Sequence, residues 1–222
     1  MILQPISIEI PALGPWLEQC FERNITARQL EAMAWLLGFW IGDGHRKGAK
    51  IALNSEDHDV NARLRENAKV WGMTLRAERG NGLGAQGYLH TYNGAVRNLN
   101  KNNPLVKVLE GLRFWENGEK NGLKSVPLFM RTEQIVVREA FLAGLIDSDS
   151  SCNIQGGSIR AEIATVYPPI GDGVNFIGRS LGLTVSVHFR GANFSERHGL
   201  KESDLWTFHY MVGQIMKHSG RY

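Results

Sequence analysis

A nine-residue pattern occurs twice in this chain of 222 residues, as LLGFWIGDG at residues 36–44 and as LAGLIDSDS at residues 142–150. Each copy is an apolar, helix-compatible stretch in which two small residues stand four positions apart, and each runs into an aspartate, Asp43 or Asp149. Small residues let two helix backbones approach closely, because no bulky side chain stands between them. The repeat therefore predicts two helices packed face to face, with Asp43 and Asp149 side by side at their ends.

Two neighbouring carboxylates raise each other's pKa, so such a pair either shares a proton or holds a hard cation through its oxygens. The alternative is that both acids only cap or solvate the helix ends. A helix C-terminus disfavours negative charge because its dipole is already negative, so the repeated acid favours a cation site. We expect Mg2+ or Mn2+ to be held by Asp43 and Asp149 together with the residues that precede them, Gly42 and Ser148.

Composition and charge narrow the class of protein only slightly. No apolar run approaches the roughly 20 residues that span a bilayer. The start of the chain has neither a basic leader nor a cleavable signal core, so we expect an intracellular protein, nuclear if its source is eukaryotic. Cys20 and Cys152 are too few for a disulfide framework or a zinc site, and we expect free, buried thiols. The net charge of +3 permits a polyanionic partner without requiring one.

The same order of helical and alternating patterns follows each motif copy. Residues Thr26 to Gln29 have the form of a capping box that starts the first motif helix. The periodicity predicts helices near residues 16–21, 26–42, 57–71, 105–112, 132–146 and 170–181, and strands near residues 50–54, 73–79, 88–92, 152–155, 158–166, 183–190 and 204–212. Gly72 and Gly182 stop corresponding helices 110 positions apart, so the repeat extends well beyond the motif.

This repeat implies two similar halves, residues 26–115 and residues 116–222, after an N-terminal extension of residues 1–25. Each half is predicted to run αββαββα, which makes the fold α/β in the broad sense (α+β). Helices must cover one face of each antiparallel sheet, and the other face stays free. A pseudo-twofold axis through the motif helices would join the free faces into one concave saddle that suits a DNA duplex.

Basic side chains occur on the strands of that expected surface. Arg and Lys on a two-stranded ribbon can enter the major groove and bond to guanine edges or phosphate oxygens. A solvated sheet face is the alternative, and Glu78 and Glu162 on the same strands leave it open. The candidate DNA-binding residues are Arg46, Lys47, Lys50, Arg76, Arg79, His90, Arg160, His188 and Arg190.

The two motifs and the blocks between them resemble the paired signature of LAGLIDADG homing endonucleases over residues 34–213. The matching blocks are Arg97–Asn100, Asn103–Leu105, Lys124–Pro127 and Arg179–Leu183. The resemblance implies a monomer that uses divalent metal ions to cleave both strands of a long, asymmetric, specific site in double-stranded DNA. Because the chain starts with Met-Ile and has no terminal His-Asn, we expect either a free-standing enzyme or an intein endonuclease domain separated from its splicing partner.

The resemblance also implies roles for individual residues. Asp43 and Asp149 match the acids that hold the metal ions. Lys124 matches a lysine beside the metals, where a cation stabilises charge that develops on the phosphate. On residue type alone, Lys124 would be read as a solvated loop residue. Thr165 matches a threonine near the second cleavage centre.

Four positions depart from the family pattern. Asn54 stands where a family relative has an acid, and it can coordinate a metal but cannot act as a base. Tyr167 stands where the relative has a histidine, and it can orient a water or a phosphate. Ser150 replaces the last glycine of the motif, which requires a backbone conformation open to other residues. Arg221 is the candidate replacement for a second active-site lysine, and one centre is expected to cut slowly if it does not substitute.

Two other functions stay open. A protein of the same fold that binds specific DNA but has lost efficient cleavage, such as a regulator or an RNA-splicing cofactor, is favoured by the altered Asn54, Tyr167 and Ser150 and disfavoured by both retained acids. An α/β enzyme for a small molecule has little support. The sequence contains no phosphate-binding glycine loop, nucleophile elbow or histidine cluster for a metal.

Overall fold

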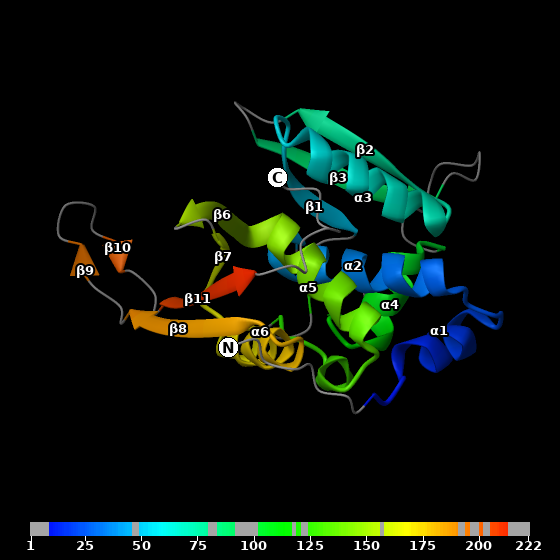
Figure 1. The fold of residues 1–222 in the computed structure, drawn as a ribbon. Helices are drawn as coiled ribbons and strands as arrows, with labels where there is room; N and C mark the ends of the chain where they lie inside the picture. Colours follow the sequence, from blue (N-terminus) through cyan, green and yellow to red (C-terminus); the bar gives the residue numbers. More distant parts are fainter. Residues whose placement is uncertain are drawn as a thin grey trace.

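The fold is that of a computed structural model, which describes residues 9–45, 49–79, 84–91, 102–116, 119–120, 124–155, 158–190, 194–195, 200–201 and 205–212. It is a mixed α/β structure with antiparallel sheets, and α2 (Ala27–Asp43) and α5 (Ile135–Asp149) lie at its centre (Figure 1). These are the two motif helices, and each ends on its motif aspartate. The predicted fold class is confirmed.

The other helices and strands lie close to the positions that the periodicity predicts. The helices are α1 (Leu13–Phe21), α3 (His58–Val70), α4 (Pro104–Gly111), α6 (Pro168–Ser180) and the short 3-10 helix η1 (Leu128–Arg131). The strands are β1 (Lys50–Asn54), β2 (Met73–Arg79), β3 (Gly84–Thr91), β4 (Trp115–Glu116), β5 (Glu119–Lys120), β6 (Ser150–Gln155), β7 (Ser158–Thr165), β8 (Thr184–Arg190), β9 (Phe194–Ser195), β10 (Leu200–Lys201) and β11 (Leu205–Val212). The largest departure is β3, which begins before the predicted residue 88 because pairing with both β1 and β2 holds its glycine-containing start extended.

Two antiparallel sheets contain most of these strands. The first has the order β1-β3-β2 and the second the order β6-β7-β11-β8, while β4 pairs with β5 and β9 with β10. Helix α3 packs against β2 of the first sheet, and α6 packs against β8 and β11 of the second (Figure 1). A helix therefore covers one face of each sheet, as expected for antiparallel sheets with a solvated side.

Cross-strand pairing separates the two faces of the first sheet. Residues directly opposite one another share a face, and Tyr88 of β3 is opposite both Lys50 and Arg76. The alternate residues include Ile51 and Leu89, which are 1% and 2% exposed and belong to the core. The polar residues at 50, 76 and 88 therefore lie on the face away from the core.

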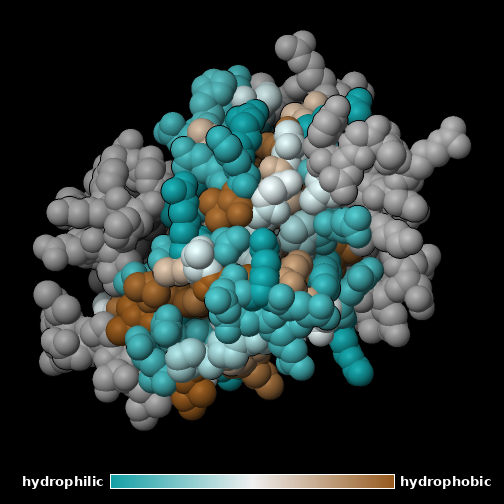
Figure 2. Space-filling view, turned by 90° about the vertical axis from the view of Figure 1, so that its right-hand side faces the viewer, coloured by the Kyte–Doolittle hydropathy of each residue, from teal (hydrophilic) through white to brown (hydrophobic). Residues whose placement is uncertain are grey.

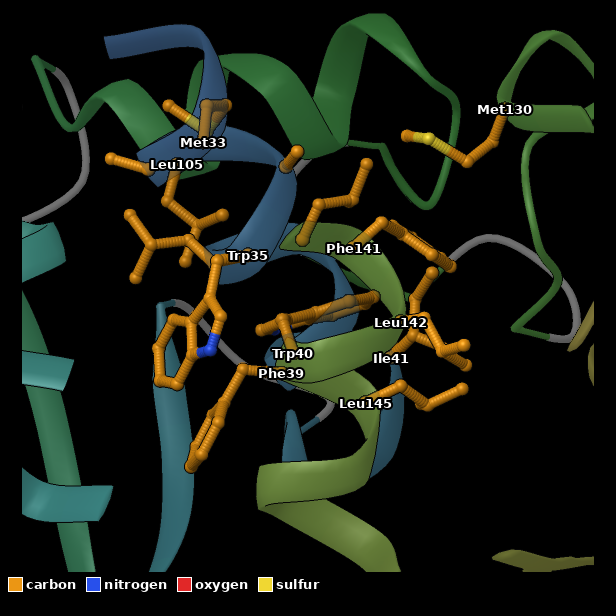
Figure 3. Packing of buried hydrophobic residues seen from close by; sticks show 14 of the residues in the cluster. Met33, Trp35, Phe39, Trp40, Ile41, Leu105, Met130, Phe141, Leu142 and Leu145 are labelled. Carbon is orange, nitrogen blue, oxygen red and sulfur yellow. The ribbon is translucent and has the colours of Figure 1, made fainter. Parts of the chain in front are cut away.

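Helices α2 and α5 approach closely because a glycine stands at each contact point. A Cβ on Gly38 would overlap the carbonyl oxygen of Phe141, and a Cβ on Gly144 would overlap that of Trp35. Side chains around this crossing form the centre of the hydrophobic core (Figure 3). Trp35, Trp40 and Phe141 are at most 1% exposed there. The small residues thus determine where the two helix ends lie.

Helix α2 begins at the predicted capping box. Thr26 Oγ1 accepts a hydrogen bond from Gln29 N at 3.2 Å, and Gln29 Oε1 accepts one from Thr26 N at 3.1 Å. Two backbone N–H groups at the helix start are satisfied in this way. The prediction of the helix start is confirmed.

The chain repeats its geometry directly after each motif helix. Gly44 bridges Ile51, and Ser150 pairs with Ile163 in the corresponding place. After Ser150 the pairing continues into the β6–β7 ladder, whereas among the described residues of the first half it is a single bridge. Among the residues that the structure describes, the first sheet has three strands and the second sheet has four. The division at residues 25 and 115 stays a prediction.

Residues before α1 are bound to a segment more than 100 positions away in the chain. Ile10 N donates to Thr132 O at 2.6 Å, and the buried carboxylate of Glu133 accepts hydrogen bonds from Ala12 N and Leu13 N. A carboxylate is favourable here because the first N–H groups of a helix are unpaired and its dipole is positive. Residues 10–13 are therefore part of the folded structure.

The face shown in Figure 2 is mainly hydrophilic, and its hydrophobic residues gather in separate patches.

The expectation that both cysteine thiols are buried is wrong. Cys20 is partly exposed, and Cys152 is exposed because it lies on β6, an edge strand of its sheet. Among the described residues, no helix combines the length and the apolar character that crossing a bilayer requires.

Candidate metal site and nucleic-acid interface

The crossing of α2 and α5 brings the ends of the two motif helices together. A Cβ on Gly42 would lie 3.1 Å from the Cβ of Asp149 and would overlap Ser148. Since Gly42 directly precedes Asp43, the missing side chain is what allows the two helix ends to meet. Asp43 is partly buried and Asp149 is the more exposed of the two acids. The fold thus places the four predicted metal-site residues at one crossing.

Both aspartates have raised pKa values. Burial raises the pKa of Asp43 from 3.8 to about 7, with a further contribution from the negative charge of Asp149 and an opposing one from Lys124. Loss of solvent also raises the pKa of Asp149, again opposed by Lys124. Keeping both carboxylates charged costs free energy, so the pair favours binding of a proton or a cation.

The raised pKa of Asp43 predicts that the metal-free protein becomes less stable as the pH rises from about 4 to about 7. Between these values the folded state keeps a proton that the unfolded chain has released, so each step up in pH favours unfolding. The free energy of unfolding should fall by up to about 4 kcal/mol over this window. Chemical unfolding in EDTA at a series of pH values measures the fall. Asp43→Asn should remove most of it, and an unchanged slope in that variant would refute the assignment.

Lys124 is buried at the same crossing. It is 8% exposed, and its Nζ donates to the carbonyl oxygens of Trp40 at 3.1 Å and Gly42 at 3.0 Å. Nζ also lies 5.1 Å from the centroid of the Trp40 ring. These carbonyls belong to the last turn of α2, where the helix dipole is negative, and the Trp40 oxygen also accepts a hydrogen bond from Gly44 N at 2.7 Å. The ammonium therefore neutralises the end of α2 and acts electrostatically on both aspartates.

A pocket of about 180 Å³ lies beside Asp149. Its polar lining residues include Asp149, Thr165 and Tyr167, and Ile41 and Gly42 of α2 also line it. Thr165 is 7% exposed, and its Oγ1 accepts a hydrogen bond from Tyr167 N at 3.1 Å. Since a water occupies about 30 Å³ in the liquid, the pocket has room for several. The structure thus brings three of the predicted catalytic residues to one solvent-accessible place.

Asn54 lies apart from this pocket. It ends β1, three residues beyond the Ile51 that bridges Gly44, which corresponds to about 10 Å along a strand. Its Oδ1 accepts a hydrogen bond from Glu56 N at 3.1 Å, so it shapes the turn that leads into α3. A catalytic role for Asn54 stays a prediction.

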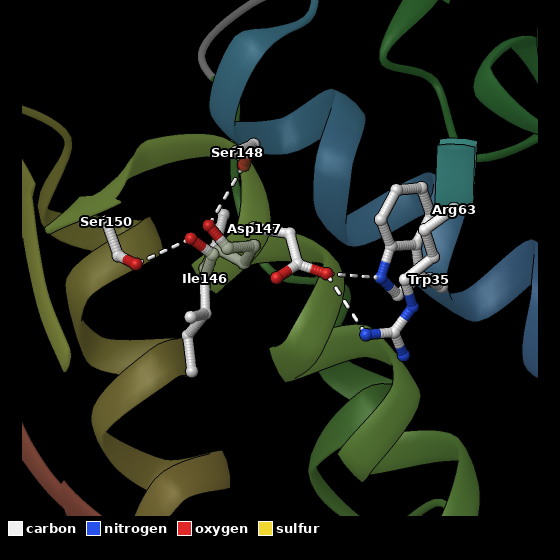
Figure 4. A network of polar contacts seen from close by, with 7 residues as sticks. Trp35, Arg63, Ile146, Asp147, Ser148 and Ser150 are labelled. Carbon is white, nitrogen blue, oxygen red and sulfur yellow. Dashed lines mark hydrogen bonds and ion pairs between the residues drawn. The ribbon is translucent and has the colours of Figure 1, made fainter. Parts of the chain in front are cut away.

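Two serines of the second motif bond back to the last turn of α5 (Figure 4). Ser148 Oγ donates to Leu145 O at 2.9 Å, and Ser150 Oγ donates to Ile146 O at 2.6 Å. Ser150 has φ −117° and ψ 151°, an extended conformation open to any residue. The loss of the motif glycine at this position therefore causes no backbone strain.

The first acid of the second motif, Asp147, has a structural role that its sequence pattern did not predict. Asp147 is 2% exposed, and its Oδ2 accepts a hydrogen bond from Trp35 Nε1 at 3.1 Å and pairs with Arg63 at 3.2 Å (Figure 4). The guanidinium of Arg63 lies 5.5 Å from the Trp35 ring centroid. The two motif copies differ at this position, because the first copy has Ile41 where the second has Asp147. That difference is the one signal in the sequence that Asp147 has a role of its own.

On the first sheet, three of the candidate DNA-binding residues share the polar face. Lys50 and Arg76 are both opposite Tyr88, and His90 lies two residues further along β3. Lys50 Nζ is 4.5 Å from the centroid of the Tyr88 ring, a cation–π contact. Arg79 is three residues beyond Arg76 in one strand, so it takes the register of the other face. The register therefore does not support the prediction that Arg79 shares a DNA-binding face with Arg76.

On the second sheet, pairing through β11 puts Arg160 and His188 in register with one face. Glu162 shares that face with them, and Arg190 takes the same register as His188 in β8. His188 is exposed and Arg160 is partly exposed. Arg46, Lys47 and Arg221 lie outside the described residues, as do the side chains of Arg79 and Arg190.

Within the described part of the chain, no cluster of three or more histidine, cysteine, aspartate or glutamate side chains could hold a metal. The donor set at the crossing is instead two carboxylates with neighbouring backbone and hydroxyl oxygens. Such a set suits a hard divalent ion rather than zinc.

Comparison with known proteins supports the resemblance drawn from the motifs. The profile of the homing endonuclease family matches residues 125–214. The chain is 38% identical over 202 residues to the homothallic switching endonuclease of Saccharomyces cerevisiae, an alignment that covers 83% of this chain and 33% of that protein. It is 28% identical over 221 residues to the catalytic subunit of the V-type proton ATPase of Candida tropicalis, with coverage of 85% and 20%. The chain thus spans a third or less of the length of these relatives.

The fold is also shared with solved homing endonucleases. I-DmoI in complex with DNA and Ca matches with a TM-score of 0.52 at 14% identity, over 83% of this chain and 84% of that chain. Mesophilic variants of I-DmoI match with a TM-score of 0.51 at 14% identity, over 83% and 90%. At such identities the likeness concerns the fold alone. The chain has the fold of LAGLIDADG homing endonucleases, and the resemblance to that family is confirmed.

Proposed function

We propose that this protein is a metal-dependent, site-specific endonuclease that cuts both strands of a long, asymmetric site in double-stranded DNA. The meeting of Asp43 and Asp149 beside the buried Lys124 supports this function most strongly. A protein that only binds DNA gains nothing from two crowded, partly desolvated acids. The 38% identity to the homothallic switching endonuclease favours the same activity.

The oxygens at the crossing fit a divalent metal ion. Asp43 and Asp149 supply carboxylates, and the Gly42 carbonyl and Ser148 hydroxyl are the adjacent donors. The raised pKa of Asp43 tests this fit, because a carboxylate that is costly as a free anion gains most from a cation. We propose Mg2+, with Mn2+ able to replace it; I-DmoI has been solved in complex with DNA and Mn. A bound ion of this kind lowers the pKa of a water and neutralises phosphate charge.

The residues around the metal site have distinct tasks in this proposal. Lys124 stabilises the negative charge that develops on the phosphate, and its ammonium is already held by two carbonyl oxygens, so little reorganisation is needed. Thr165 and Tyr167 orient water or a phosphate oxygen in the pocket beside Asp149. Because the side chains around Asp43 differ from those around Asp149, the two cleavage centres are not equivalent.

The polar faces of the two sheets are the proposed DNA-binding surface. Lys50 and Arg76 on the first sheet and Arg160 and His188 on the second can neutralise phosphates or reach base edges. Two halves that differ in sequence suit an asymmetric site bound by one monomer. In a eukaryotic cell such an enzyme acts in the nucleus.

A library of randomised DNA sites tests the proposed function. Sequencing of the ends cut in Mg2+ should recover one family of long, asymmetric sites, and EDTA should abolish cutting. A mobility shift on the same library without cutting would favour the second candidate, a DNA-binding regulator or RNA-splicing cofactor. The neutral Asn54, which stands where a family relative has an acid, is the observation that favours this second candidate.

DNA binding should weaken steeply with salt. Each neutralised phosphate contributes about −0.9 to the slope of log K against log[salt], so roughly four to eight contacts predict a slope of about −4 to −7. Fluorescence anisotropy with the selected site in Ca2+, over about 50 to 200 mM salt, measures it. Arg76→Gln should make the slope shallower by about one unit. A flat profile for the wild-type protein would refute the proposed surface.

A further inference from the structure

We infer that Arg63 is a positioning residue for Asp149 and acts through Asp147 and Trp35. This inference rests on the proposed endonuclease function. It identifies a polar contact that sets where one of the two acids stands.

The contact joins three helices at one oxygen. Asp147 Oδ2, on α5, accepts hydrogen bonds from Trp35 Nε1 of α2 at 3.1 Å and from Arg63 of α3 at 3.2 Å (Figure 4). The Asp147 side chain is 0% exposed and that of Arg63 is 24% exposed. Hydrogen bonds to a buried carboxylate are strong and directional, so the carboxylate has one preferred position.

This position determines the rotation of the last turn of α5. Asp149 follows Asp147 by two residues, which places the two side chains about 200° apart around a helix. Anchoring Asp147 toward α2 and α3 therefore directs Asp149 to the other side of α5, where its Cβ adjoins Gly42. A small rotation of this turn would move Asp149 away from Asp43.

The contact exists on one side of the pseudo-symmetric crossing. Ile41 replaces Asp147 in the first motif copy. The residue 110 positions after Arg63, the offset of the repeat, is Gly173 of α6, where a Cβ would overlap Val126. At Gly173, α6 therefore packs closely against Val126, and this position has no positively charged side chain that could correspond to Arg63. The two acids are therefore positioned by different means, and Asp149 depends on the helix that packs against the first sheet.

The test is a variant that removes both charges and keeps the hydrogen bond to Trp35. Arg63→Met alone leaves a buried anion and is expected to unfold readily. Arg63→Met combined with Asp147→Asn avoids this, because a neutral amide oxygen still accepts from Trp35. Arg65→Met, at an exposed position of α3, is the matched control. Arg63→Lys keeps a positive charge and tests for rescue.

The double variant should melt close to the wild-type temperature and bind the selected site in Ca2+ within about twofold. Its single-turnover cleavage rate should fall about 10- to 100-fold with KM nearly unchanged, because an acid displaced by a fraction of an ångström binds substrate but reacts poorly. Arg63→Lys should recover most of the rate, and Arg65→Met should equal wild type. A folded double variant with the wild-type rate would overturn the inference while leaving the endonuclease function intact. If wild type itself cuts no library site, the proposed function fails and this inference falls with it.

Discussion

Replacing Asp43 or Asp149 with asparagine should reduce DNA cleavage by about a thousandfold or more. Asparagine matches the shape of aspartate but lacks the charge, and charge stabilisation at a metal site amounts to several kcal/mol, with tenfold in rate for each 1.4 kcal/mol. Single-turnover cleavage of the selected site in Mg2+ measures the loss. DNA affinity should change little, because the proposed binding surface lies on the two sheets.

The same variants should be no less stable than the wild-type protein. Because the pKa of Asp43 is raised to about 7, its charged form destabilises the metal-free fold at higher pH, and the neutral amide removes this cost. Asp43→Asn should therefore melt at a higher temperature than wild type at about pH 8 in EDTA. Asp59→Asn, an exposed acid on α3, is the control and should keep full activity. Normal cutting by Asp43→Asn or Asp149→Asn would refute the proposed metal site.

Gly144→Ala should destabilise the whole protein by about 2–4 kcal/mol. The added methyl group would overlap the carbonyl oxygen of Trp35, and backbone atoms cannot move aside without separating α2 from α5. Thermal or denaturant unfolding gives the change in free energy. Cleavage should fall as well, since the same separation displaces Asp43 from Asp149.

Gly14 provides a matched comparison for this substitution. It lies in α1, and a Cβ there would be 3.6 Å from Leu30, an ordinary contact. Gly14→Ala should therefore be neutral or stabilising by about 0.5–1 kcal/mol. Equal stability of Gly144→Ala and wild type would show that the close crossing is not what holds the two helices in place.

Local patterns predicted most of the secondary structure. The capping box at Thr26 and the glycines at 72 and 182 correctly located helix ends, because these signals act on backbone groups within a few residues. Strand β3 began earlier than predicted since its glycine-containing start has little strand tendency of its own. Its partners on both sides keep it extended.

The candidate site was only partly predictable. The repeated motif alone placed Asp43 and Asp149 together, because close helix packing follows from the small residues in each copy. Without the family pattern, Lys124 would have been assigned to solvent. Its burial depends on the carbonyl oxygens of Trp40 and Gly42 at the negative end of α2, which no local pattern around residue 124 reveals.

The contact between Asp147 and Arg63 shows the same limit. The two residues are 84 positions apart, and nothing near either predicts the other. The sequence by itself determined the repeated helices, the alternating strands and the pair of acids, since each follows from short-range periodicity or from residue type. Only the tertiary structure decided which polar groups are buried and what they bind. Burial and binding of these groups depend on exclusion of water and on partners that are distant in the chain. Both conditions arise only when the helices pack.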